Sequence, residues 1–101
     1  MSHKVLLTIE IGDEATPKQR KQFYEELLNR NYKEIDKLQT KWQANYSDEF
    51  TEKSVISMLK REVEESVQKT GIRHYSVVAH FELSNLVIFF SGQSKSESTD
   101  F

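Results

Sequence analysis

The order of two hydrophobic periodicities along this chain constrains its fold more than any other feature. Apolar and polar residues alternate over Lys4 to Ile11, Leu38 to Tyr46 and Tyr75 to Leu83, the period-two pattern of strands with one covered face. Between these segments, apolar residues recur at helical spacing over Thr16 to Arg30 and Thr51 to Thr70. We therefore expect amphipathic helices packed on a sheet.

Capping residues mark the ends of both helical segments. Thr16-Pro17-Lys18-Gln19 has the pattern of a capping box with proline at the first helical position. Thr51 can cap the second helix, and Gly71 can adopt the left-handed conformation that ends it. These residues predict where each helix begins and where the second one ends.

Two shorter segments complete the pattern. Tyr32 to Ile35 predicts a short strand that a tight turn at Asp36-Lys37 joins to the next strand, and Ser84-Asn85 precedes a final strand over Leu86 to Phe90. The expected fold class is α+β, a ferredoxin-like βαββαβ sandwich with an extra C-terminal strand. Its two helices should lie on one face of an antiparallel sheet.

Length and composition indicate a single domain. The chain has 101 residues, 37% of them hydrophobic, and a formal net charge of -2. We expect residues 1–90 to form the domain and the Ser-rich residues 91–101 to be a disordered tail. Because no apolar run is long enough, we expect no membrane-spanning segment, and we expect no secretory signal before the first strand. The absence of cysteine fits a cytoplasmic location.

Two segments carry a resemblance to a known family. One reads Leu6-Leu7-Thr8-Ile9-Glu10, a hydrophobic run that ends in an acid, and the other reads Leu38-Gln39-Thr40-Lys41-Trp42. In this pattern the chain resembles the small CRISPR-associated endoribonucleases of the spacer-acquisition complex and their SinR-like relatives. It is similar in the same way to the antitoxin endoribonucleases of type V toxin-antitoxin systems. The resemblance implies a ferredoxin-like fold, a homodimer and a role in nucleic-acid metabolism or defence.

The resemblance also implies a metal site. The family has an aspartate where this chain has Glu10. In a dimer packed as the family packs, two copies of Glu10 can share a Mg²⁺ ion with a phosphate group, which makes Glu10 the candidate catalytic and metal-binding residue. The alternative interpretation is a solvent-exposed strand residue near the loop acids Asp13 and Glu14.

A basic stretch is the best nucleic-acid signal in the residues themselves. Lys33, Lys37 and Lys41 can project from one hairpin and follow the phosphate backbone of RNA or DNA. A solvated polar sheet face explains the same three lysines. Trp42 can be a base-stacking platform or a core residue.

Other catalytic chemistry has little support in the sequence. The three histidines do not have a zinc-ligand spacing, and the isolated glycines form no phosphate-binding loop. His80 can be a general base near a dimer seam or a structural residue, since the sequence places no obvious orienting acid beside it.

The apolar last strand must be buried against a partner chain or against the rest of its own chain. Leu86-Val87-Ile88-Phe89-Phe90 is apolar on both faces, so either a symmetric partner adds its sheet to this edge or the strand is covered by its own chain. Two functions follow. The first is a nucleic-acid-binding protein or weak metal-dependent endoribonuclease that uses Glu10 and the Lys33 to Lys41 hairpin. The second is a non-enzymatic protein–protein interaction module, a homodimer through the C-terminal strands, whose sheet edge or helices dock a protein partner.

Overall fold

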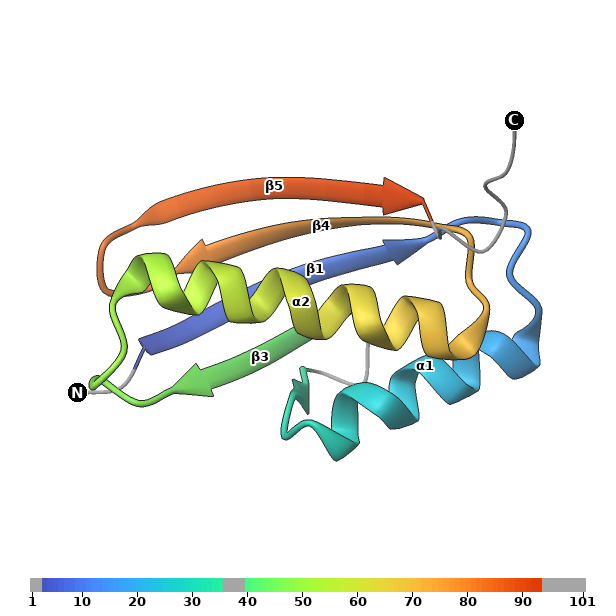
Figure 1. Ribbon diagram of the computed structural model, residues 1–101, viewed down its shortest axis with the longest axis horizontal. Coiled ribbons are helices and arrows are strands. Elements are labelled where there is room, and N and C mark those ends of the chain that lie inside the picture. The colour runs from blue at the N-terminus through green and yellow to red at the C-terminus, as the bar shows by residue number, and fades with distance from the viewer. Residues whose placement is uncertain (1–2, 36–39, 94–101) are drawn as a thin grey trace.

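The computed structural model describes residues 3–35 and 40–93 of the chain. They form two layers, an open five-stranded antiparallel sheet and two helices on one of its faces, which confirms the expected α+β class (Figure 1). The elements in chain order are β1 (His3–Ile11), α1 (Pro17–Asn29), β2 (Lys33–Glu34), β3 (Lys41–Tyr46), α2 (Glu52–Thr70), β4 (His74–Phe81) and β5 (Leu86–Gln93).

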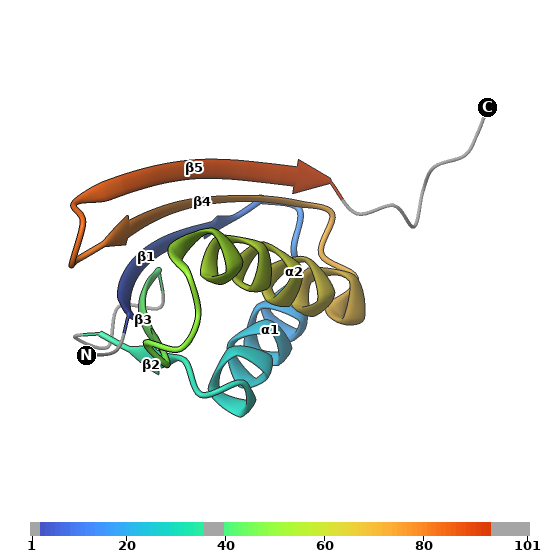
Figure 2. The same ribbon diagram turned by 60° about the vertical axis from the view of Figure 1, so that its left-hand side comes forward.

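β1 lies at the centre of the sheet. The strand order is β2-β3-β1-β4-β5, and each of these neighbours pairs in the antiparallel direction. The pairing of β2 with β3 and of β4 with β5 confirms the two expected strand pairs. Because α1 connects β1 to β2 and α2 connects β3 to β4, the two crossovers place both helices on the same face (Figure 2). The arrangement is consistent with a ferredoxin-like type of fold.

The capping residues act at the helix ends where the sequence predicts them. The Thr16 hydroxyl accepts the N–H of Gln19, and the Gln19 side chain accepts the N–H of Thr16 in return. Thr51 caps the start of α2, and Gly71 ends it with a left-handed φ of 78°. The chain then folds back, so that Ile72 is fully buried in the core.

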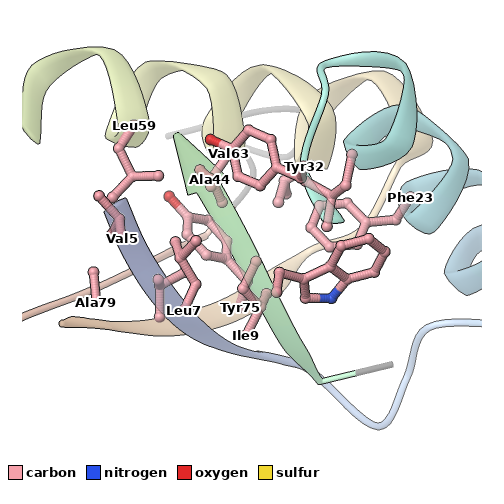
Figure 3. Close-up of a cluster of buried hydrophobic side chains, with 14 of the residues drawn as sticks. Val5, Leu7, Ile9, Phe23, Tyr32, Ala44, Leu59, Val63, Tyr75 and Ala79 are labelled. Atoms are coloured by element: carbon pink, nitrogen blue, oxygen red, sulfur yellow. The ribbon is translucent and has the colours of Figure 1, made fainter. Parts of the chain in front are cut away.

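The core lies between the sheet and the helices. Val5, Leu7 and Ile9 of β1 point into the space that Leu59 and Val63 of α2 enter from the other side (Figure 3). Alternate residues of each strand therefore meet one stripe of each helix, as the two periodicities predict.

Trp42 belongs to this core. Its side chain is 1% exposed, and its ring stacks on Tyr24 of α1 with a centroid distance of 6.0 Å. A buried ring has no free face for a base, so the core interpretation of Trp42 is confirmed and the stacking-platform interpretation is wrong.

One polar cluster lies at the edge of the core. The hydroxyls of Tyr32 and Tyr46 both donate to Oε1 of Glu62 on α2, at 2.9 and 2.8 Å. Burial raises the pKa of both tyrosines well above its ordinary value of 10. The cluster ties the residue before β2 and the end of β3 to α2.

β2 is shorter than the expected strand Tyr32 to Ile35, and Thr40 lies in a turn before β3; two further boundaries differ at the β4–β5 hairpin. β4 ends at Phe81, and Leu83 lies exposed in the turn, where Asn85 has a φ of 60° and donates its N–H to the Phe81 carbonyl oxygen at 2.8 Å. β5 continues to Gln93, so residues 91–93 pair with β4 and belong to the sheet. Backbone hydrogen bonds extend this strand beyond its apolar residues, which composition does not predict.

Some expectations lie outside the described residues. These are the turn at Asp36-Lys37, the strand residues Leu38 and Gln39, and the tail from residue 94 onwards. Within the described part of the chain, neither helix has the length and apolar character needed to cross a membrane.

Candidate nucleic-acid interface

The sheet face opposite the helices has no second layer in the described part of the chain (Figure 2). Residues that pair across neighbouring strands share a face, so the register decides which side chains this face carries. One row of paired residues runs from β3 to β5 and consists of Lys41, Thr8, Val78 and Phe89. A second row runs from β2 to β5 and consists of Lys33, Gln43, Leu6, His80 and Val87. We call these two rows the open face.

The β4–β5 end of the open face is apolar. Phe89 is 67% exposed, Val87 58% and Val78 42%. The alternate residues of β5 pack against the core on the other side: Leu86, Ile88 and Phe90. The chain itself therefore covers one face of the last strand and leaves the other face uncovered.

The β2–β3 end of the open face is basic. Lys33 pairs with Gln43, two residues after Lys41, so both lysines project from the same face. Both are exposed, and neither forms an ion pair within residues 3–35 and 40–93. Lys37, the third expected lysine, lies outside the described residues. Between the two ends, a hollow of about 350 Å³ is lined in part by Leu6, Thr8 and His80.

Glu10 lies on the same side of the sheet, near the end of β1. It is exposed and pairs with Ser76 of β4. In the part of the chain that the structure describes, no three His, Asp or Glu side chains are grouped so that they could hold a metal ion. A Mg²⁺ ion bound by protein usually takes one or two carboxylates and keeps several waters. Glu10 supplies at most one of these carboxylates, and within the described residues it belongs to no group of three such side chains.

A carboxylate–histidine pair lies beside Glu10. Oε2 of Glu14 and Nδ1 of His74 are 2.6 Å apart, and the two side chains are 42% and 53% exposed, respectively. The hydrogen bond from His74 holds the pKa of Glu14 below its ordinary value of 4.5. Sequence reasoning missed this pair, because the two residues are 60 positions apart and neither belongs to a motif.

The other two described histidines have different partners. Nε2 of His3 lies 2.7 Å from the carbonyl oxygen of Phe50, which ties the start of β1 to the loop before α2. Nε2 of His80 lies 3.4 Å from Oδ1 of Asn85, an amide that cannot orient a general base as a carboxylate does. His74 is thus held against a carboxylate at hydrogen-bond distance, while the charge of His3 acts on the carboxylate of Asp48.

The comparisons with known proteins add no relative. No family model, no curated protein and no solved structure matches this chain.

Proposed function

We propose that this chain is a ferredoxin-like domain that binds single-stranded nucleic acid on the open face. The row from Lys41 to Phe89 carries the proposal, because it joins an exposed lysine to an exposed aromatic ring on one uncovered face. The central position of β1 and the two crossover helices on one side support the ferredoxin-like assignment.

Phe89 supplies the stacking surface. Stacking of a base on an exposed ring contributes about 1–3 kcal/mol and tolerates any sequence, because every base has a π-face. Bases inside a duplex are already stacked on their neighbours, so an exposed ring selects unpaired strands of RNA or DNA. Val78 and Val87 extend the apolar surface around Phe89.

Lys33 and Lys41 supply the phosphate contacts. Three strand spacings separate β3 from β5, which corresponds to about 14 Å. A strand whose base stacks on Phe89 can therefore cross the sheet and bring its phosphates to the lysines. Phosphate contacts position a nucleic acid without reading its bases, so we expect weak sequence preference and strong salt dependence.

A fluorescence-anisotropy titration with short single-stranded and duplex RNA and DNA tests this function. We expect Phe89→Ala to weaken single-strand binding roughly 5- to 150-fold, the equivalent of about 1–3 kcal/mol. Lys33→Glu with Lys41→Glu should lower the affinity and reduce the slope of log affinity against log salt by about two. Both variants should fold, because all three side chains are exposed.

Lys18→Glu with Lys53→Glu is the matched control. It makes the same change in net charge, but in the first turns of α1 and α2, where the helix dipole favours an acid. If this control loses as much affinity as the open-face double variant, binding depends on net charge alone and the proposed surface is wrong.

The Mg²⁺-dependent endoribonuclease activity implied by the resemblance is tested in the same samples. As the resemblance implies it, a second copy of the chain brings its own Glu10 to the ion, because the described part of one chain groups no three potential ligands. Cleavage that appears with Mg²⁺ and persists in Glu10→Gln would exclude Glu10 as the metal ligand.

A homodimeric interaction module is the second candidate function. β5 is one of the two edge strands of the described sheet, and it leaves Val87 and Phe89 exposed beside that edge. A chain that binds no nucleic acid but is dimeric by light scattering would favour this function. A cytoplasmic location suits either role.

A further inference from the structure

We propose that His74 and Glu14 form a metal-independent acid–base site that cleaves RNA bound on the open face. This inference rests on the proposed function and names its substrate, an RNA strand with a free 2′-hydroxyl. It assigns a chemical role to a pair of residues that the binding surface does not use.

The tight turn between β1 and α1 builds the pair. The Gly12 carbonyl oxygen accepts the N–H of Ala15 at 3.1 Å and Nη2 of Arg20 at 2.9 Å, while the Gly12 N–H donates to the His74 carbonyl oxygen at 2.9 Å. These bonds hold the turn against the start of β4. The backbone from which the Glu14 side chain reaches His74 is therefore held in place, while both side chains of the pair remain exposed.

Gly12 also provides the space for the carboxylate. A Cβ atom on Gly12 would lie 2.6 Å from Oε1 of Glu14, closer than real contacts allow. Any other residue at this position would push the carboxylate aside. The missing side chain of Gly12 thus lets Glu14 sit where it reaches His74.

The hydrogen bond selects the reactive form of the imidazole. An ionised carboxylate is an acceptor only, so Nδ1 of His74 carries the proton that is shared with Glu14. In the neutral ring, Nε2 then has the lone pair that a general base needs. Glu14 also stabilises the positive charge that forms when Nε2 takes up a second proton.

The pair lies within reach of the proposed RNA path. His74, Ser76 and Val78 alternate along β4 and share the face that carries Phe89. The four residue steps from His74 to Val78 span about 13 Å. A hollow of about 280 Å³ beside the pair is lined in part by Glu10 and Ser76, which leaves room for a ribose and its phosphate.

The reaction is a transesterification within the RNA. Nε2 of His74 takes the proton of the 2′-hydroxyl, the 2′-oxygen forms a bond to the adjacent phosphorus, and the bond from phosphorus to the 5′-oxygen breaks. The leaving 5′-oxygen takes a proton from a water molecule, and the remaining hydroxide recovers the proton from His74. The products are a 2′,3′-cyclic phosphate and a 5′-hydroxyl, and neither a metal nor an oxidant takes part.

Water is the acid because no second histidine is close enough. His80 lies six residues further along β4, about 20 Å from His74 in an extended strand. The exposure of the pair gives water access to the leaving group.

The test is cleavage of end-labelled single-stranded RNA by the full chain in excess EDTA. We expect products with 2′,3′-cyclic phosphate ends, and no cleavage of the same strand when its 2′-hydroxyls are replaced by hydrogen or methoxy groups. His74→Ala should lower the cleavage rate roughly 10²- to 10⁴-fold and retain RNA binding. His3→Ala, prepared in the same way, is the control histidine at the opposite end of β1 and should cleave normally.

Two further variants test the positioning of the base. Glu14→Gln and Gly12→Ala should both lower kcat while KM stays unchanged, since both leave the open face intact and weaken the partner of His74. Glu14→Asp, which keeps the charge, should restore part of the rate.

The outcomes separate the two proposals. Absence of RNA binding would refute the proposed function, and the cleavage site with it. Binding without cleavage in EDTA, or cleavage that His74→Ala does not slow, would refute the acid–base site alone.

Discussion

Removal of the Glu62 carboxylate is the sharpest test of how this small fold is held together. Tyr32, next to β2, is 3% exposed, and its hydroxyl and that of Tyr46 meet one oxygen of Glu62 on α2. Glu62→Ala removes the acceptor that both hydroxyls share and leaves them only each other, 3.2 Å apart. The cost should therefore exceed that of an ordinary surface substitution.

The magnitude follows from the two hydrogen bonds. A hydrogen bond to a charged group contributes about 1.5–3 kcal/mol, so the upper bound for two is about 6 kcal/mol. Tyr46 is only partly buried, so water can replace its lost partner, and alanine gains a few tenths of a kcal/mol in helix propensity. We expect a loss of about 2–4 kcal/mol in the free energy of unfolding.

Urea denaturation followed by circular dichroism measures this loss. With a slope near 2 kcal/mol per M, the midpoint should fall by about 1–2 M. Glu64→Ala is the matched control, an exposed glutamate two residues along the same helix, and should change stability by less than about 0.5 kcal/mol. Glu62→Gln, whose amide oxygen can still accept, should lose less than Glu62→Ala. Equal losses for Glu62→Ala and Glu64→Ala would refute the structural role of the cluster.

Three further predictions concern the core, a helix cap and the carboxylate–histidine pair. Trp42→Ala removes a fully buried ring and should lower the free energy of unfolding by about 3–5 kcal/mol, seen as a large drop in the thermal midpoint. A drop no larger than that of a substitution at an exposed residue would contradict the packing of Trp42. Thr16→Ala removes one half of the capping box and should cost about 1 kcal/mol in the same assay, whereas Thr16→Ser should be nearly neutral. His74→Gln should raise the pKa of Glu14 towards 4.5, measured by carboxyl NMR. Because the pKa of Glu14 is lowered in the folded protein, its contribution to stability is present above pH 4.5 and is lost as the pH falls through the folded pKa. If the Glu14 carboxyl titrates identically in His74→Gln and in the unmodified protein, His74 is not the cause of the lowered pKa.

Part of the proposed binding surface could be predicted from the sequence. The basic hairpin was expected, and the register places Lys33 and Lys41 on one face. Phe89 was missed as a surface residue because Leu86 to Phe90 is apolar throughout, and a continuous apolar run does not show which residues face the core. Glu10 was expected at a metal site, and its surroundings in the described part of one chain do not supply the other ligands.

The sequence by itself determined the elements and their order, because periodicity and capping act between residues a few positions apart. Thr16, Thr51 and Gly71 set the helix ends that the structure shows. Only the tertiary structure decided that Trp42 is buried while Phe89 is exposed, and that Glu14 meets His74 across 60 residues. Those outcomes depend on strand register and on the side of the sheet that the helices cover, and both are set by packing of the whole chain.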